Sequence, residues 1–185
     1  MERSIPIEKA CMDAMHELLQ TKMLSRITVQ DILAAVGISR ATFYRHYRDR
    51  EDLFEKMIRR DVDSVFTNVC DLDRWRTRAE KFAESLRADK KVLYKMVRSD
   101  PGGFQTFYTN ILYELLLKRL YRLHDEGFAV TPALRRRFLY MSAGAAAALG
   151  DWIQGGCAES PQEIGLEISA LFHESGVTTV LEKNS

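Results

Sequence analysis

The residues with the types and spacing to do chemistry lie between positions 39 and 50. Four arginines stand there against one aspartate, a net charge of +3 in twelve residues. Hydroxyl-bearing side chains lie between the arginines, and both guanidinium and hydroxyl groups reach phosphate oxygens. The pattern favours a helix that lies against phosphates, and its outward-facing residues are Arg40, Thr42, Tyr44, Arg45 and His46.

Two short helices must position these residues. Thr28 caps the first of them, with Asp31 in the capping-box position, and Gly37 supplies the permissive backbone that ends it. Ser39 caps the second, in which Phe43 and Tyr47 face inward. Two short helices joined by a tight turn predict a helix-turn-helix, whose second helix suits a DNA major groove. On these residues alone, a helical head that binds another protein stays open as the alternative.

The chain as a whole carries a net charge of only +1, because opposite local charges cancel. Residues 1–60 hold 11 basic and 9 acidic side chains, and residues 61–185 hold 16 and 17. A hydrophobic fraction of 46% and a charged fraction of 29% are typical of globular proteins and exclude wholesale disorder. The basic excess therefore coincides with the helix that would face DNA.

Several classes of protein are excluded by missing patterns. Cys11, Cys70 and Cys157 form no closely spaced pair, so neither a disulfide framework nor a zinc site is expected. The sequence has no nucleophile–base pair and no glycine loop for phosphate, so we expect no enzyme, no cofactor and no metal. The start of the chain lacks a signal peptide, and the uncharged stretch near residues 138–150 is too short to span a bilayer. A protein of the cytoplasm is expected.

Helical periodicity runs through the chain, and no convincing alternating strand is present. We expect an all-α protein with a three-helix, DNA-binding head over residues 1–50, a fourth helix over residues 49–69 that connects, and a helical body over residues 70–185. Further helices are expected at about 74–88, 89–98, 104–124, 131–154 and 160–174. The Ser-Asp-Pro-Gly-Gly segment at 99–103 is the strongest break between them.

The head also resembles a known family. The series Thr28…Ile32…Gly37-Ile38-Ser39…Thr42-Phe43-Tyr44-Arg45-His46-Tyr47…Arg50…Leu53 is similar to the signature of TetR/AcrR-family transcriptional regulators, and it covers about a seventh of the chain. The resemblance implies a homodimer that binds a double-stranded operator and carries a helical body for a small effector. It implies a repressor that the effector releases from a pseudo-palindromic site.

The resemblance also assigns roles to residues. Thr42, Tyr44 and His46 match positions that touch the DNA backbone, whereas Arg50 replaces the usual lysine with a planar fork. Thr28 and Gln30 match positions that meet phosphate or a base edge. Arg40, Ala41 and Arg45 match the base-reading positions, where arginine favours a G·C-containing half-site. The expected DNA-binding set is Thr28, Gln30, Ser39, Arg40, Ala41, Thr42, Tyr44, Arg45, His46 and Arg50.

The small-residue segment at 138–153 and the last helix are expected to form a four-helix bundle with their copies in a partner subunit, as the resemblance implies. The alternative is a close helix crossing within one chain. The expected dimer residues are Met141, Ala145, Ala148, Leu149, Trp152, Ile164, Ile168, Leu171 and Phe172.

An effector pocket is expected among the aromatic and aliphatic residues of the body, and an apolar or aromatic effector is favoured. The alternatives are that these side chains are plain core, or that the body binds a partner protein, as in an activator. The expected pocket residues are Phe82, Leu86, Tyr94, Phe104, Phe107, Tyr108, Ile111 and Tyr140.

Overall fold

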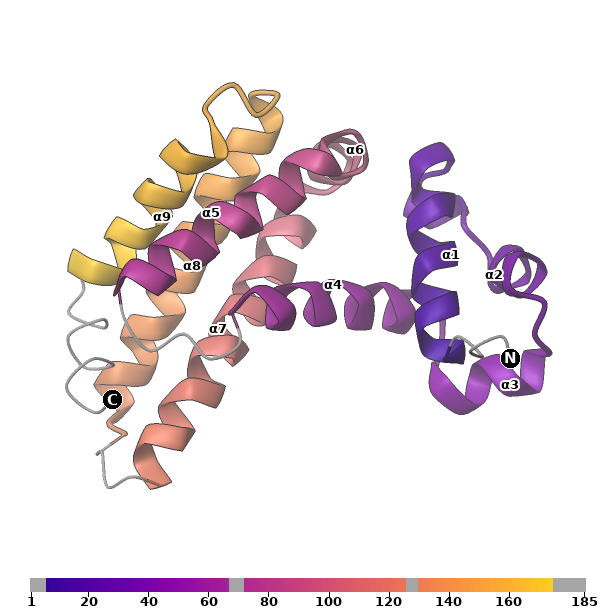
Figure 1. Cartoon of the computed structure of the whole chain (residues 1–185), viewed down its shortest axis with the longest axis horizontal. Coiled ribbons are helices and arrows are strands. Elements are labelled where there is room, and N and C mark those ends of the chain that lie inside the picture. Colours follow the sequence, from indigo (N-terminus) through magenta and orange to yellow (C-terminus); the bar gives the residue numbers. More distant parts are fainter. Residues whose placement is uncertain (1–5, 67–71, 126–129, 175–185) are drawn as a thin grey trace. The chain divides into compact units, whose positions relative to one another are not determined.

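The computed structural model describes residues 6–66, 72–125 and 130–174, and every regular element in these ranges is helical (Figure 1). The all-α prediction is confirmed. The chain divides into two compact units, residues 1–61 and 62–185. The division falls inside the helix that the sequence predicts as the connector, and the predicted end of that helix at 67–69 lies outside the described residues.

The first unit is the head. It contains α1 (Ile7–Thr21), a short 3-10 turn (Leu24–Arg26), α2 (Val29–Val36), α3 (Arg40–His46) and most of α4 (Arg50–Phe66). The 3-10 turn has no counterpart in the sequence prediction. One apolar face from each helix meets in a shared core, whose most deeply buried side chains are Cys11, Met15, Ile27, Ile32, Phe43 and Leu53.

Side-chain caps fix where the helices of the head begin. Thr28 and Asp31 form the predicted capping box of α2, and Ser39 accepts a hydrogen bond from the backbone N–H of Thr42 at the start of α3. Between these helices, Gly37 takes the left-handed conformation at φ 75°. A side chain there would be strained, so glycine is what lets α2 end and the chain turn toward α3.

The second unit is the body. It contains α5 (Leu72–Ala88), α6 (Lys90–Ser99), α7 (Pro101–Asp125), α8 (Pro132–Gln154) and α9 (Pro161–Glu174). Helix α9 packs along α5, and α7 packs along α8. At the α5–α9 crossing, a Cβ added to Gly165 would lie 2.7 Å from the backbone nitrogen of Glu80. The two main chains therefore approach too closely for any side chain at this position.

The start of α7 differs from the sequence prediction. The expected break at residues 99–103 is mostly helical, because α7 begins at Pro101 and not at Phe104. The carboxylate of Asp100 accepts a hydrogen bond from the backbone N–H of Gly103 (2.8 Å), which is the bond of a helix cap. Proline is favoured in a first helical turn. The Ser-Asp-Pro-Gly-Gly segment at 99–103 thus contains a helix start.

Helix α8 ends in a tight turn that the double glycine at 155–156 permits. Gly156 has φ 77°, and Cys157 follows with φ 56°, its backbone N–H bonded to the carbonyl of Trp152 (2.8 Å). The indole N–H of Trp152 in turn donates to the carbonyl of Glu159 (3.1 Å). These bonds bury Cys157 and fix the path from α8 to α9. None of the helices described here has the length and apolar character needed to cross a membrane.

Candidate nucleic-acid interface

Helix α3 has one inward and one outward face, as its sequence predicts. Phe43 and Tyr47 are buried, with their rings 5.4 Å apart. Arg40, Ala41, Tyr44 and Arg45 are exposed, and Thr42 and His46 are half-buried. The predicted polarity of the helix is confirmed, and its roles in binding DNA remain predictions.

Tyr44 is the most prominent ring on this surface, with 47% of the residue exposed. The ring meets the edge of Phe43 at 5.4 Å, and the guanidinium of Arg40 lies 5.7 Å from its centroid. An exposed ring that is braced from two sides presents its hydroxyl at a defined place. Arg45 has no ion-pair partner in the described parts of the chain, so its guanidinium is available to an anion.

Two of the predicted contact residues already serve as helix caps. The hydroxyl of Thr28 lies 2.9 Å from Asp31 Oδ2, and the hydroxyls of Ser39 and Thr42 lie 2.9 Å apart. These bonds orient the hydroxyl groups at the N-termini of α2 and α3. The nearby Gln30 is exposed. A helix N-terminus favours anions, so the same groups suit a phosphate.

Helix α3 is attached to α1 through Glu8. Its carboxylate oxygen Oε1 lies 3.3 Å from Nδ1 of His46, and its backbone carbonyl accepts the hydroxyl hydrogen of Tyr47 (3.3 Å). Within the part of the chain that the structure describes, Nε2 of His46 has no hydrogen-bond partner. Nε2 is buried, so a ligand would reach it only after a neighbouring side chain moves.

The buried hydroxyl of Tyr47 needs a partner on sequence grounds, and the carbonyl of Glu8 is that partner. Burial, with smaller contributions from the nearby Cys11 and Glu8, raises the pKa of Tyr47 to about 12. The ammonium group of Lys56 on α4 lies 5.1 Å from the centroid of the same ring. It also donates to the carbonyl of His46 (2.9 Å), so α4 holds the end of α3 as well.

Arg50 points into the head. Its Nη1 donates to the carbonyl oxygens of Ser25 (3.0 Å) and Ile27 (2.5 Å), and its Nε lies 2.6 Å from Glu51 Oε1. The guanidinium thus joins the start of α4 to the turn before α2. The structure gives Nη1 backbone partners and Nε a carboxylate partner inside the head, and the DNA contact of this residue stays a prediction.

Two carboxylates reinforce these connections. Although burial opposes it, the backbone N–H of Arg48 and the ammonium of Lys56 lower the pKa of Asp52. A hydrogen bond from Lys22, with further bonds from Thr28, lowers the pKa of Asp31 to about 2. Both acids are ionised at neutral pH and hold the helix starts on either side of α3.

Glu8 and Lys56 are the residues that sequence reasoning misses. Each lies outside the helix-turn-helix pattern, and Glu8 is 38 residues away from His46. No local spacing indicates such a contact. The exposed Glu8 and Lys56 also sit on helix faces that are rich in charge.

In the body, the structure brings together most of the predicted pocket residues but not all. Phe104 and Tyr108 stack with centroids 4.5 Å apart, and Phe82 and Phe107 lie 6.4 and 5.4 Å from Tyr108. Leu86 and Ile111 are also buried. Tyr94 and Tyr140 do not share this environment, because Tyr140 is 68% exposed and Tyr94 stands on the surface of α6.

Most of the predicted dimer residues are buried within the single chain. They lie in the core between the body's own helices, and their role in a dimer stays a prediction; they are Met141, Ala145, Leu149, Trp152, Ile164 and Ile168. Ala148 is half-buried, Leu171 is exposed, and the side chain of Phe172 lies outside the described residues. The exposed large apolar side chains of α8 and α9 are Leu139, Tyr140, Leu166 and Leu171.

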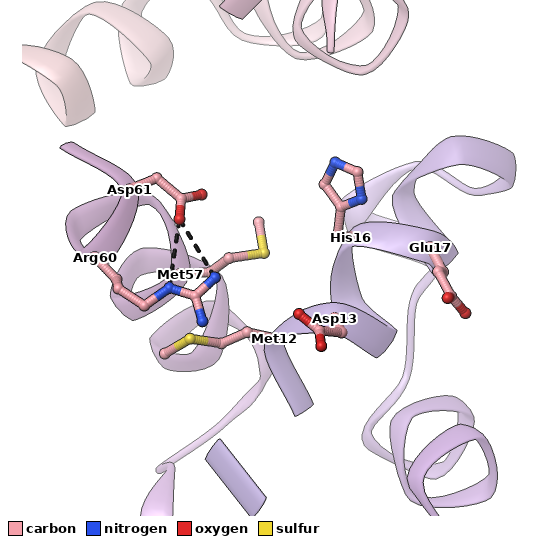
Figure 2. Close-up of a pocket in the computed structure, with 7 residues that line it drawn as sticks. All are labelled: Met12, Asp13, His16, Glu17, Met57, Arg60 and Asp61. Carbon is pink, nitrogen blue, oxygen red and sulfur yellow. Dashed lines mark hydrogen bonds and ion pairs between the residues drawn. The ribbon is translucent and has the colours of Figure 1, made fainter. Parts of the chain in front are cut away.

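A pocket of about 330 Å³ lies within the head, between α1 and α4 (Figure 2). Its lining combines two methionines with charged groups, and none of the predicted DNA-binding residues belongs to it; the lining residues are Met12, Asp13, His16, Glu17, Met57, Arg60 and Asp61. The guanidinium of Arg60 pairs with Asp61, and Asp13 pairs with Lys9 (2.6 Å). In the described ranges, no cluster of histidines, cysteines and acids could hold a metal ion.

Comparison with known proteins agrees with this arrangement. Residues 12–57 match the family described as bacterial regulatory proteins, tetR family. The match contains the whole of α2 and α3 and extends from α1 into α4. It therefore covers the elements that present and support the candidate interface.

Two curated relatives extend the similarity. An HTH-type transcriptional regulator of Staphylococcus aureus (strain USA300) is 27% identical over 115 residues, which are 58% of this chain and 62% of the relative. The HTH-type dhaKLM operon transcriptional activator DhaS of Lactococcus lactis is 24% identical over 120 residues, 65% of this chain and 63% of the relative. The chain thus spans less than two thirds of the length of these relatives.

Solved structures show that the fold is shared over nearly the whole chain. The dihydroxyacetone kinase operon activator DhaS superposes with a TM-score of 0.64 at 20% identity, covering 94% of this chain and 98% of its own. Thermus thermophilus FadR, a TetR-family transcriptional repressor in complex with lauroyl-CoA, gives 0.57 at 17% identity, covering 91% and 94%.

Proposed function

Because this chain belongs to the TetR family of helix-turn-helix transcriptional regulators, we propose that it binds a pseudo-palindromic DNA operator as a homodimer. In this proposal it acts in the cytoplasm as a repressor, and a small effector bound to the body releases it from DNA. The family is one of regulators and not of enzymes.

The observation that carries the proposal is the outward face of α3. It displays the guanidinium groups of Arg40 and Arg45 beside the ring of Tyr44, and Arg45 has no ion-pair partner among the described residues. Arginine pairs bidentately with guanine in the major groove, and tyrosine hydroxyls bind phosphates. We therefore assign base recognition to Arg40, Ala41 and Arg45, and backbone contacts to Thr42, Tyr44 and His46.

The proposed dimer follows from the exposed apolar surface of α8 and α9. Leu139, Tyr140, Leu166 and Leu171 are large side chains that burial against a second copy would remove from water. A two-fold dimer places two copies of α3 in successive major grooves, with half-site centres roughly 34–36 Å apart. The proposed operator is accordingly a pseudo-palindrome.

The proposed effector site is the aromatic cluster around Tyr108. The side chains of this cluster are mainly apolar, which favours an apolar or aromatic effector. The lauroyl-CoA complex of the FadR relative supports the same choice, because a lauroyl chain is apolar. Such an effector lowers DNA affinity if it binds more tightly to a body conformation in which the heads are wrongly spaced.

The DhaS relatives support a second candidate function. By name, one is an activator of the dhaKLM operon and the other of a dihydroxyacetone kinase operon, so similarity alone favours activation as well as repression. In this alternative the body binds a partner protein and no small effector. A dimer that increases transcription from its own site, and only with a second protein present, would support it.

The first experiment is the selection of bound duplexes from a random DNA pool by the full chain. We expect one enriched pseudo-palindrome whose binding weakens with salt. Arg45→Ala should relax the preference at one base pair per half-site, whereas Tyr44→Phe should weaken all sequences alike. An enriched set with no common sequence, and equal effects of the two substitutions, would contradict the proposal.

The second experiment addresses the dimer and the effector. Leu166→Glu and Tyr140→Glu should shift the molecular mass measured by light scattering from dimer to monomer. Arg76→Glu, at an exposed position of α5, is the matched control. Lauroyl-CoA and free laurate then serve as probes of effector binding. Release of the selected DNA by either compound supports the repressor, and release by neither favours the partner-binding alternative.

A further inference from the structure

Helix α6 carries a second basic surface, which lies in the body and away from the helix-turn-helix sequence. Its buried side is formed by Val92, Leu93 and Val97. At 3.6 residues per turn, five of its exposed residues fall within one arc of about 140°. We call this surface the α6 basic face, and it consists of Lys90, Lys91, Tyr94, Lys95 and Arg98.

The cations of the α6 basic face have no acidic partners among the residues that the structure describes. Lys91 and Lys95 are one helical turn apart, a spacing at which like charges destabilise a helix. Arg98 instead turns to Tyr94: its Nη1 donates to the tyrosine hydroxyl (3.1 Å), and its guanidinium lies 5.7 Å from the ring centroid. The hydroxyl that accepts this bond keeps its own hydrogen for another acceptor.

Positive charge is concentrated on α6, and a second basic run lies at residues 135–137 on α8. Residues 90–99 hold four basic and no acidic side chains, whereas the remainder of residues 62–185 holds 12 basic and 16 acidic ones, a net charge of −4. A surface that only keeps a protein in solution mixes both signs. The segregation indicates that the α6 basic face meets a polyanion.

We propose that the α6 basic face binds the phosphate backbone of duplex DNA next to the operator. The proposal rests on the DNA binding proposed above, which brings this polyanion to the protein. The face is the convex outside of a helix, which suits a row of repeated charges and not an enclosed small anion. Lysine, arginine and tyrosine hydroxyl groups are also the usual donors to DNA phosphates.

The test uses the full chain with Lys90→Gln, Lys91→Gln and Lys95→Gln together, because glutamine keeps the helix propensity and removes the charge. Binding is measured over a salt series on two duplexes. One is limited to the sequence recovered by selection, and the other extends it by about 10 base pairs, one helical turn, on each side. Wild type should show a steeper dependence of log affinity on log salt for the longer duplex.

On the longer duplex, the triple variant should lose up to about 2.7 per subunit from that slope, or about 5.4 for the proposed homodimer, because each phosphate contact contributes about 0.9. On the shorter duplex, the variant and wild type should agree. The matched control removes three exposed cations elsewhere in the body, by Arg76→Gln, Lys81→Gln and Arg136→Gln, and should leave both slopes unchanged. Circular dichroism verifies that both variants are folded.

Equal slopes for wild type and the α6 variant on the longer duplex would overturn the proposal. Equal losses in the α6 and control variants would also overturn it, because net charge alone would then explain the result. If polyglutamate binds wild type but not the α6 variant while the DNA slopes agree, the face serves an acidic protein. Wild type that binds neither duplex marks a failure of the proposed function itself.

Discussion

The carboxylate of Glu8, at the start of α1, lies 3.3 Å from Nδ1 of His46, at the end of α3. The backbone of the same glutamate accepts the hydroxyl of Tyr47. One residue of the first helix therefore orients two consecutive residues at the end of the helix that faces outward. These contacts join α1 to the end of α3, in addition to the connection through the turn at Gly37.

Glu8→Ala should weaken DNA binding without unfolding the head. The substitution removes the contact with His46 but keeps the backbone carbonyl that accepts from Tyr47. A lost hydrogen bond of this kind costs about 0.5–1.5 kcal/mol, which corresponds to a loss of affinity of about 2- to 10-fold. Glu8→Gln, which keeps an oxygen acceptor, should retain most of the affinity. Equal affinity of Glu8→Ala and wild type on the selected duplex would rule out this role.

Arg50→Lys should destabilise the head although it keeps the charge. A single ammonium group does not reproduce the fork that bonds Ser25, Ile27 and Glu51 together. We expect a loss of about 1–3 kcal/mol in the free energy of unfolding, measured with urea. The salt dependence of DNA binding separates the two possible roles. A phosphate contact by Arg50 predicts that Arg50→Ala lowers the slope by about 0.9 per subunit, whereas a positioning role leaves the slope unchanged.

The helix-turn-helix and its polarity follow from the sequence because each step is local. Caps at Thr28 and Ser39 and the left-handed position at Gly37 depend on residues at most three positions apart. The inward direction of Phe43 follows from the helical period alone. The role of Arg50 is not local, since its partners belong to a 3-10 turn about 25 residues earlier in the chain. A motif fixes the residue type at such a position but not the direction of its side chain.

Tyr47→Phe should make the free energy of unfolding of the head fall less steeply as the pH becomes alkaline. The pKa of Tyr47 is raised to about 12 in the folded head, above the value of about 10 for an exposed tyrosine. Its contribution is fully present below about pH 10 and is lost as the pH rises to about 12, because only the unfolded chain ionises in this window. The shift corresponds to about 2.7 kcal/mol at most. Urea unfolding at pH 9 and above measures it, and Tyr44→Phe, at an exposed ring, serves as the control.

Gly165→Ala should destabilise the body by about 1–3 kcal/mol. The added Cβ would lie 2.7 and 2.8 Å from the backbone N and Cα of Glu80, and backbone atoms on a packed helix do not move aside as a side chain does. Gly144→Ala is the matched control, because its Cβ would meet only the end of Leu171 at 3.8 Å. The control gains helix propensity and should be neutral or more stable. A melting temperature that is unchanged in Gly165→Ala would contradict the close crossing.

The body is harder to derive from its sequence than the head. Its helices follow from periodicity and from the caps at Thr131 and Ser160, which the structure confirms. The packing partners of each apolar face cannot be predicted from the sequence, because the pattern at Trp152 and Ile168 fits both a core and a dimer surface. Their burial within one chain depends on how the helices pack. The tight approach at Gly165 likewise has no signal in the sequence beyond the glycine itself.

The buried thiols give each unit its own reporter of opening. Cys11 lies in the core of the head and Cys157 in the body, and burial raises the pKa of both thiols. A thiol that neither ionises nor reaches solvent does not react with an alkylating reagent until its surroundings open. In a Cys70→Ser background, the labelling rate of Cys11 therefore measures unfolding of the head, and that of Cys157 measures unfolding of the body. Mass spectrometry of the two peptides follows both in a single sample, with no probe added to the chain.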